Sequence, residues 1–551
     1  MKPTSPQSHA PAPTPLAPRR SIRWRGLIII LALGATLLVV ASMLLGDRGE
    51  RTVATVYAVP ALVMILTTIW WLVFSGARWL TRLAGLGAAA ALACGAGALV
   101  RLDGFEGDMF PRLAWRSSPT REEVLEAFRD NGATPAPEVA ARAAALALPD
   151  WPGFRGRGRD GVETDVRLSR DFAARPPREL WRHPVGLGWS SFVIAGDLCF
   201  TQEQIGAREA VVCYDVTSGA KLWEHLDEAR FSEALGGDGP RSTPTLEGDR
   251  LYALGAAGNL DCLDAASGAP IWSANILADA GADNITWGMS ASPLIAGNLV
   301  VVNPGGRNGK GVIAYERATG TIRWARGDEP ASYAGLRLEN ILGKPQLILF
   351  DGAGLAGLRP DDGTEVWRYP WTNDPRVNAA QPIAPSVGPD GAPSEDLIFI
   401  SSGYNVGSAL LRIRADGERH SVEPVWRKDN FFKLKFNDAV LSNGVVYGLD
   451  EGLPSAIEIA TGKRLWKARA DAGYGQLILL GDILVILSER GDLIFAEANS
   501  ERWVEIHRTP ALSAKTWNHP AYARGRLLVR NDREAVCYEL ALEYAAAPET
   551  R

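Results

Sequence analysis

CYDVTSGAKLW, from Cys213 to Trp223, has the pattern of a strand, a tight turn at Ser218-Gly219 and the start of a second strand. Similar stretches recur along the chain: CLDAASGAPIW (Cys262 to Trp272), AYERATGTIRW (Ala314 to Trp324), LRPDDGTEVW (Leu358 to Trp367), AIEIATGKRLW (Ala456 to Trp466), and diverged copies that end at Trp426 and Trp503. Repeats with periods of about 40–50 residues are typical of propellers, solenoids and repeat arrays. The repeat therefore decides the fold class.

Each repeat unit contains four short β-type runs, which favours a propeller. In the second unit they are RSTPTLEG, DRLYALGAAG, NLDCLDAASG and PIWSAN, the pattern of an up-and-down four-stranded blade. The last unit stops after its third strand, whereas RELWRHP (Arg178 to Pro184) carries a repeat-type Trp with no blade before it. We predict an all-β, eight-bladed propeller of four-stranded blades, closed by pairing of this first strand with the last blade.

The recurring residues have structural roles in this prediction. The Gly supplies the positive φ that a tight turn requires, and the Trp is large enough to fill the space between neighbouring blades. Cys213, Cys262 and Cys537 occupy one column of the repeat, where other units have Ala or Gly. That column favours a small buried residue, so these cysteines are expected in the core rather than in disulfides or metal sites.

Three apolar runs near the N-terminus predict three transmembrane helices within residues 26–100. They cover residues 26–46, 53–74 and 83–100, and the third is rich in Ala and Gly, which suits close packing against the other two helices. The N-terminal tail and the second loop are basic, whereas the first loop is charge-balanced. The positive-inside rule then predicts a cytoplasmic N-terminus in the inner membrane and a periplasmic or otherwise extracytoplasmic propeller.

The remaining boundaries follow from composition. Residues 1–25 form a basic cytoplasmic tail that is Pro-rich and disordered at its start, residues 101–150 a connector, residues 151–541 the propeller and residues 542–551 a disordered tail. Within the connector, TREEVLEAFRD predicts a short helix capped by Thr120, followed by an Ala- and Pro-rich tether.

The Asp/Ala-x-x-[ST]-Gly-x-x-x-Trp repeat resembles the pyrroloquinoline quinone (PQQ) enzyme repeat over roughly residues 151–541. Further matches to PQQ-binding-like propeller proteins are WPGFRGRGRDG (Trp151 to Gly161), TQEQ (Thr201 to Gln204), GPRSTP (Gly239 to Pro244), YGLDEG (Tyr447 to Gly452) and KTWNHP (Lys515 to Pro520). The superfamily includes quinoprotein alcohol dehydrogenases and the non-enzymatic outer-membrane assembly lipoprotein, so the resemblance implies the fold and leaves the activity open.

Composition and motifs narrow the function classes. The formal net charge of −5 argues against nucleic-acid binding. A quinoprotein dehydrogenase needs PQQ, Ca²⁺ held by oxygen ligands and a carboxylate base, and the family often adds a vicinal Cys pair or a haem domain. This sequence has no vicinal Cys pair and no CxxCH motif. His183, His225, His507 and His519 lack ligand spacing, so we predict no metal site and expect these histidines on the surface or in blade packing.

Eight polar or aromatic residues at the ends of inner strands are candidates to line the central channel and bind a ligand. They are Glu203, Arg241, Lys433, Lys435, Gln476, Trp517, Asn518 and Arg533. Lys433 and Lys435 are expected on one face of a strand within FFKLKFND. We hypothesise a membrane-anchored binding or scaffolding module for a protein partner in the envelope or a small ligand. The alternatives are a PQQ-dependent oxidoreductase with Ca²⁺ and, with less support, a membrane sensor.

Overall fold

The computed structural model describes residues 22–45, 51–106, 109–131, 146–386, 394, 396–417 and 419–543. The predicted disordered ends of the chain and the Ala- and Pro-rich tether fall largely outside these ranges. The chain divides into two compact units, residues 1–118 and 119–551, and each is described by itself.

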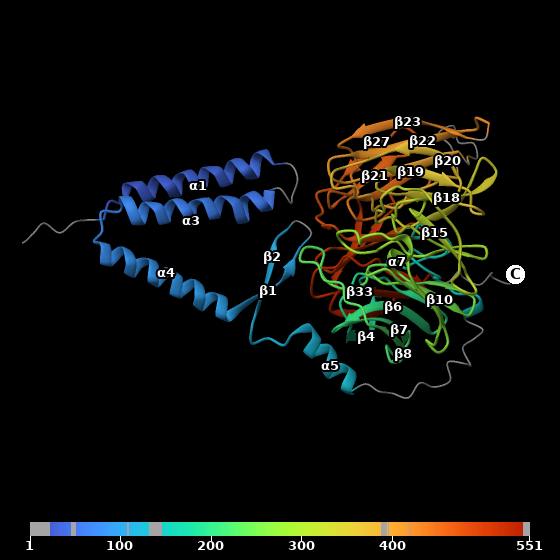
Figure 1. The fold of residues 1–551 in the computed structure, drawn as a ribbon, viewed down its shortest axis with the longest axis horizontal. Coiled ribbons are helices and arrows are strands. Elements are labelled where there is room, and N and C mark those ends of the chain that lie inside the picture. Colours follow the sequence, from blue (N-terminus) through green and yellow to red (C-terminus); the bar gives the residue numbers. More distant parts are fainter. Residues whose placement is uncertain are drawn as a thin grey trace, which may run out of the picture. The chain divides into compact units, whose positions relative to one another are not determined.

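The first unit contains three helices that are long and apolar enough to cross a membrane, as the sequence predicted (Figure 1). The first is α1 (Arg25–Leu44), the second is continuous through η1 (Val53–Ala58), α3 (Val59–Ile69) and η2 (Trp70–Phe74), and the third is α4 (Trp79–Leu99). An antiparallel hairpin of β1 (Val100–Phe105) and β2 (Pro111–Trp115) follows, which the sequence had not suggested.

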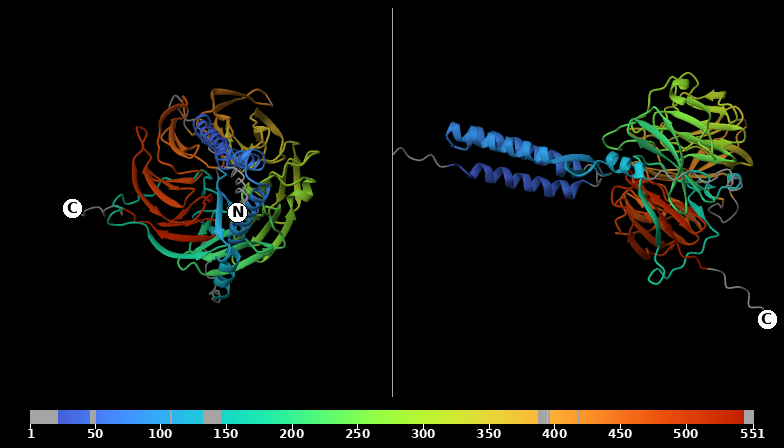
Figure 2. Two further views of the ribbon diagram at one scale, coloured as in Figure 1. Left: turned by 90° about the vertical axis from the view of Figure 1, so that its left-hand side faces the viewer. Right: turned by 90° about the horizontal axis from the view of Figure 1, so that it is seen from below.

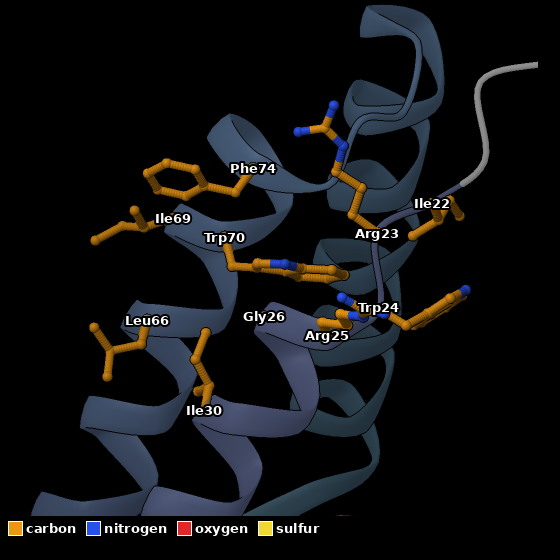
Figure 3. A pocket seen from close by; sticks show the side chains of 10 residues that line it. All are labelled: Ile22, Arg23, Trp24, Arg25, Gly26, Ile30, Leu66, Ile69, Trp70 and Phe74. Atoms are coloured by element: carbon orange, nitrogen blue, oxygen red, sulfur yellow. The ribbon is translucent and has the colours of Figure 1, made fainter.

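Glycines determine where these helices pack closely. A Cβ on Gly26 would lie 2.7 Å from the Trp70 ring, and one on Gly34 would lie 2.5 Å from Val63. Figure 3 shows the Trp70 ring lying over Gly26. In contrast, a Cβ on Gly87, Gly95 or Gly97 of α4 meets nothing within 4 Å in the described part of the chain. The prediction that the small residues of the third run pack against the other two helices is therefore wrong for most of α4, and α1 with α3 forms the tight pair.

An open hollow of about 810 Å³ lies at the end of this unit where α1 begins and η2 ends (Figure 3). Its lining combines Trp24, Trp70 and Phe74 with Arg23 and Arg25. Aromatic rings beside arginines are typical of the boundary between hydrocarbon and head groups. We therefore interpret the hollow as lipid-facing surface.

The second unit contains eight small sheets arranged as the blades of a propeller (Figures 1 and 2). Blade 1 consists of β5 (Val193–Ala195), β6 (Leu198–Ile205), β7 (Arg208–Asp215) and β8 (Lys221–Asp227). Blade 2 consists of β9 (Thr245–Glu247), β10 (Arg250–Leu254), β11 (Asn259–Asp264) and β12 (Pro270–Asn275), and the short helix α7 (Ile276–Ala280) follows it. Blade 3 consists of β13 (Leu294–Ala296), β14 (Leu299–Val302), β15 (Val312–Glu316) and β16 (Ile322–Arg326). Blade 4 consists of β17 (Arg337–Ile341), β18 (Lys344–Phe350), β19 (Gly354–Leu358) and β20 (Glu365–Pro370).

The second half of the ring follows the same order. Blade 5 consists of β21 (Leu397–Ser402), β22 (Gly407–Arg414) and β23 (Ser421–Asp429), with a single bridge from Ile383 to Phe399 at the inner position. Blade 6 consists of β24 (Val440–Ser442), β25 (Val445–Asp450), β26 (Leu453–Glu458) and β27 (Lys463–Lys467). Blade 7 consists of β28 (Gln476–Leu480), β29 (Ile483–Leu487), β30 (Asp492–Glu497) and β31 (Glu505–Pro510). Blade 8 consists of β32 (Ala521–Ala523), β33 (Arg526–Arg530), β34 (Glu534–Glu539) and β4 (Arg178–Pro184).

The ring closes as the sequence predicted. The strand β4 pairs antiparallel with β34 and places Trp181 opposite Cys537. The predicted helix α5 (Arg121–Asn131) forms too, because Thr120 and Glu123 exchange a reciprocal capping pair of hydrogen bonds at 3.2 and 2.6 Å. It lies against β4 at this junction, and Arg129 forms an ion pair with Glu224 of β8. At the other end of the chain, pairing extends to Glu543, whose N–H donates to the Arg167 carbonyl at 2.9 Å.

In five blades the repeat Trp contacts the turn of the next blade. The indole of Trp181 lies over the turn of blade 1, where a Cβ on Gly219 would be 2.7 Å away, and its N–H donates to the Val216 carbonyl at 2.7 Å. Four further pairs repeat this contact: Trp223 with Gly268, Trp272 with Gly320, Trp324 with Gly363 and Trp426 with Gly462. Gly is therefore required at these turn positions for two reasons: the backbone has a positive φ, and the Trp ring leaves no space for a Cβ.

The cysteine column is also as predicted. Cys213, Cys262 and Cys537 are fully buried, and each lies opposite the Trp of the neighbouring strand. All five cysteines remain thiols. One copy departs from the pattern: Trp503 precedes β31 and packs on Trp466, with 5.8 Å between the ring centroids.

Candidate functional site

The two faces of the propeller differ in what they carry. One face carries the connections between blades and the loops between the second and third strands of each blade. We call it the crossover face. The opposite face, with the turns between first and second and between third and fourth strands, is the hairpin face. All eight predicted residues lie at the crossover ends of their blades. Glu203 belongs to β6 and Gln476 to β28, and the other six lie in loops next to β9, β24, β32 and β34.

The centre of the ring is filled by the chain itself. Residues 151–163, which contain WPGFRGRGRDG, reach the inner strands of seven blades. The contacts run from a bridge between Trp151 and Ile194, through a bond from Leu246 N to the Pro152 carbonyl at 2.7 Å, to the parallel pairing of β3 (Val162–Glu163) with β28. We call residues 151–163 the plug. The motif that resembles the family's opening sequence thus has a structural role here.

Two arginines hold the plug at the axis. Arg155, 1% exposed, donates to the carbonyls of Asp160, Ala439 (2.6 Å) and Leu477 (3.4 Å). Arg159 donates to the carbonyls of Ser292 and Pro293, each at 3.1 Å. Together with Arg337, which donates to the Arg159 carbonyl at 2.6 Å, they join blades 3, 4, 6 and 7 to one segment.

A buried charged group accompanies the plug. The Asp438 carboxylate lies 3.6 Å from the Arg155 guanidinium and 3.0 Å from His519 Nε2, and it also accepts from Gln381 N at 2.5 Å. Burial opposes ionisation of Asp438, but Arg155 and His519 lower its pKa overall. Burial lowers the pKa of His519, so the imidazole is neutral near pH 7. Both oxygens of the Asp438 carboxylate are therefore occupied by protein donors.

Glu203 belongs to a second closed network between blades 8 and 1. It is 1% exposed, its Oε1 accepts from the Tyr214 hydroxyl and its Oε2 accepts from Gly186 N, both at 2.7 Å. Arg530 lies beside it and donates to the Gln202 carbonyl at 2.8 Å and the Gly186 carbonyl at 2.9 Å. This network stabilises the junction where the ring closes.

Gln476 and Asn518 are also buried. The Gln476 side chain donates to the Phe436 carbonyl at 3.0 Å, and Asn518 donates to the Ser190 carbonyl at 2.8 Å. Both therefore tie an inner strand to its neighbour. These two candidates act in packing, as polar groups in propeller interiors commonly do.

The half-buried candidates Lys435 and Trp517 lie in an aromatic cluster. Trp189, Trp517, Phe436 and Tyr474, from blades 1, 8, 6 and 7, form a chain with centroid separations of 4.9, 4.8 and 5.1 Å. The Lys515 ammonium lies 4.0 Å from the Trp517 ring centroid and 4.9 Å from that of Trp189. We call these four rings with Lys515 and Lys435 the aromatic arc.

Lys435 extends the arc, since its ammonium lies 4.8 Å from the Tyr474 ring and 5.4 Å from that of Tyr404. Lys433 forms an ion pair with Glu451 at 3.3 Å. The prediction that both lysines lie on one face of a strand is wrong, because residues 431–439 form an irregular loop before β24. Lys433 and Lys435 both lie on the crossover face because this loop places them there, not because residues alternate along a strand.

Arg241 and Arg533 are bonded to loops of their own blades; the loop that holds Arg241 also accepts a hydrogen bond from Trp189 at Gly236. Arg241 donates to the carbonyls of Gly237 (2.6 Å) and Gly239 and packs on the Phe231 ring at 4.5 Å. Burial lowers the pKa of Arg241 to about 10. Arg533 lies in the loop between β33 and β34, where its N–H donates to Asn531 at 2.9 Å.

These residues do not fit a PQQ–Ca²⁺ site. The carboxylates near the axis, Glu203, Glu489 and Asp438, each accept hydrogen bonds on both oxygens from protein groups. Trp189 and Trp517 touch each other at an interplanar angle of 44°, so they leave no parallel slot for a planar quinone.

Sequence reasoning missed part of this site. The sequence indicates Lys515 only as part of the KTWNHP motif and gives no sign of a role for Trp189, and it does not show that Arg155, Asp438 and His519 are partners. The burial of Lys515 could not be predicted from the sequence, because lysine side chains are mostly exposed, whereas this one is only 6% exposed. The signal that was present is the KTWNHP motif, which carries Lys515, Trp517 and His519 together.

The fold and the repeat define the class as an eight-bladed β-propeller. Residues 207–468 match the profile of the family described as outer membrane protein assembly factor BamB. The chain is similar to the outer membrane protein assembly factor BamB of Burkholderia pseudomallei (strain K96243), with 25% identity over 339 residues that cover 53% of this chain and 85% of that protein.

Solved structures show the same fold. The quinohemoprotein alcohol dehydrogenase of Comamonas testosteroni aligns with a TM-score of 0.57 at 13% identity, covering 75% of this chain and 85% of that one. A europium-containing methanol dehydrogenase aligns with a TM-score of 0.54 at 12% identity, covering 71% and 91%. The chain therefore shares the propeller fold with these proteins, and part of its repeat array is similar to that of the BamB family.

Proposed function

We propose that this protein is a membrane-anchored, extracytoplasmic binding module whose crossover face recognises an envelope protein. The observation that carries the proposal is the aromatic arc. Aromatic rings and cations are enriched at protein interfaces, where they provide large contact area at low entropic cost. Trp517, Phe436 and Lys435 are partly exposed and are supplied by loops on rigid strands.

Two further observations support binding rather than catalysis. The carboxylates of Glu203 and Asp438 are bound by neighbouring protein groups, and Arg155 of the plug is bonded to the inner end of blade 6. The similarity to BamB, whose name describes an assembly factor of outer-membrane proteins, supports a protein partner. The three apolar helices provide the anchor.

The orientation is part of the proposal. Arg23 precedes α1, Arg25 is its first residue, and Arg78 and Arg82 flank the start of α4. These arginines lie at the same end of the helical unit, since Arg23 N donates to the Ser75 carbonyl at 2.9 Å and Trp71 donates to the Arg82 carbonyl at 2.9 Å. Clustered arginines favour the cytoplasmic side. A reporter that is active only in the cytoplasm, fused at the C-terminus, is expected to stay silent, and an active fusion would reverse the orientation.

Photo-crosslinking tests the face. A crosslinking amino acid is placed at Asn405 or Arg490, both exposed on the crossover face, and at Ala318, exposed on the hairpin face, as a matched control. We expect one discrete envelope-protein adduct from the first two positions, reduced by Lys435→Ala, and none from Ala318. Equal adducts from both faces would contradict the proposal.

A cofactor titration tests the alternative. Full-length protein in detergent is titrated with PQQ and Ca²⁺ while absorbance and alcohol-dependent dye reduction are followed. We expect neither saturable binding nor turnover at high micromolar PQQ. Saturable binding with turnover would replace the binding module by a quinoprotein oxidoreductase.

A further inference from the structure

A polar cluster lies where the repeat normally places core side chains, at the interface of blades 1 and 2. Asp261 of β11 faces blade 1, and its column in the other blades holds small or apolar residues, with one Ser. These are Val212, Ile313, Ala356, Ala409, Ser455, Phe495 and Val536. A carboxylate in this column has no role in blade packing, so its partners require an explanation.

The facing strand β8 supplies those partners. Residues two apart on a strand share a face, so His225 and Asp227 point the same way as Trp223, which lies over Gly268 of blade 2. One ligand atom from each of His225, Asp227 and Asp261 lies within 4.8 Å of the others. The cluster is therefore built by two blades and by no single repeat.

The hydrogen bonding of this cluster is incomplete. Asp261 is 2% exposed, and among the described residues its Oδ1 has no hydrogen-bond partner. His225 Nε2 lies 3.5 Å from Asp227 Oδ1, too far for a good hydrogen bond, and it also has no partner in the described part of the chain. A buried carboxylate oxygen aimed at a second carboxylate costs free energy unless a proton or a cation lies between them.

Electrostatics point the same way. Burial and the neighbouring Asp227 charge raise the pKa of Asp261 to about 7. Glu209 of β7 lies opposite Asp227 of β8 in the sheet. Burial, together with the charges of Asp227 and Asp261, raises the pKa of Glu209 to about 7. Cation binding would relieve the repulsion among these groups and release the proton that the pair otherwise shares.

We propose that His225, Asp227 and Asp261 bind one divalent transition-metal ion, such as Zn²⁺ or Mn²⁺, that clamps blade 1 to blade 2. One imidazole and two carboxylates suit these ions better than Ca²⁺ or Mg²⁺, which take oxygen ligands. Ligands about 2.1 Å from an ion lie roughly 3–4 Å apart, so binding would draw the three side chains together by about 1 Å. His225 and Asp227 are partly exposed, which provides a route for the ion.

The test uses untagged full-length protein in detergent, stripped with a chelator and titrated with Zn²⁺ or Co²⁺ at pH 7.5 by calorimetry and Co²⁺ absorption. We expect one equivalent with proton release and a rise in melting temperature. Asp261→Asn, which keeps the side-chain shape, is expected to weaken binding at least tenfold and abolish the thermal shift. Glu228→Gln removes the same charge one residue from Asp227 on an exposed side chain, so it should bind like the natural protein.

Two results would overturn the proposal. One is that the natural protein binds no metal equivalent, which would show that Asp227 and Asp261 share a proton instead. Alternatively, Asp261→Asn and His225→Gln could bind as tightly as Glu228→Gln, which would place the ion elsewhere. Circular dichroism and the melting temperature of each stripped variant separate loss of a ligand from loss of the fold.

Discussion

Replacing Arg155 with Ala should destabilise the propeller more than any exposed substitution in the plug. The change leaves Asp438 buried without its guanidinium and leaves the carbonyls of Ala439 and Leu477 without donors. Breaking a buried ion pair by removing one partner costs about 3–5 kcal/mol. Unfolding entropy of about 2.1 cal/mol/K per residue gives about 0.8 kcal/mol/K for some 390 residues, so a loss of about 4 kcal/mol lowers the Tm by about 5 °C.

The assay is thermal unfolding of the full chain in detergent, followed by tryptophan fluorescence. Arg157→Ala is the matched control, because Arg157 is exposed in the same segment and its loss should cost under about 0.5 kcal/mol. The double variant Arg155→Met with Asp438→Asn removes both charges and should recover part of the loss. Equal melting temperatures for Arg155→Ala and Arg157→Ala would refute the argument that the plug is held by this buried pair.

Two other predictions follow from the geometry of the blades and the axis. Gly268→Ala should destabilise the protein by about 1–3 kcal/mol more than Gly248→Ala, because both have positive φ but only the Cβ at 268 overlaps the Trp223 ring; equal unfolding midpoints would contradict the Trp-over-Gly contact. Burial lowers the pKa of His519 and of His183 below the unfolded value, so the stability that their neutral forms contribute is present above about pH 6.5 and is lost as pH falls below it. Melting temperatures at pH 8 and 5.5 should therefore diverge for the natural protein and diverge less for His519→Gln, and an unchanged difference would show that His519 is not the group that titrates.

The local features were predictable because they depend on short-range rules. A Gly at a positive φ, a small residue opposite a Trp and a Thr-x-x-Glu cap each follow from a few neighbouring residues. Closure of the ring by β4 was predictable too. The last repeat lacks its fourth strand and the first strand belongs to no preceding blade, so the two can complete one sheet. The loop that carries Lys433 and Lys435 was not, because apolar and polar residues alternate in FFKLKFND as they would in a strand, and tertiary contacts override that pattern.

The repeat, the number of blades and the apolar helices could be predicted from the sequence alone. Which of the candidate residues pair with one another depends on the folded ring. Glu203, Gln476 and Asn518 turned out to be buried and bonded, Lys435 and Trp517 joined the aromatic arc, and WPGFRGRGRDG filled the axis. The physical reason is distance along the chain: Arg155 meets Asp438, and His225 meets Asp261, through ring closure and blade stacking, which no local pattern encodes.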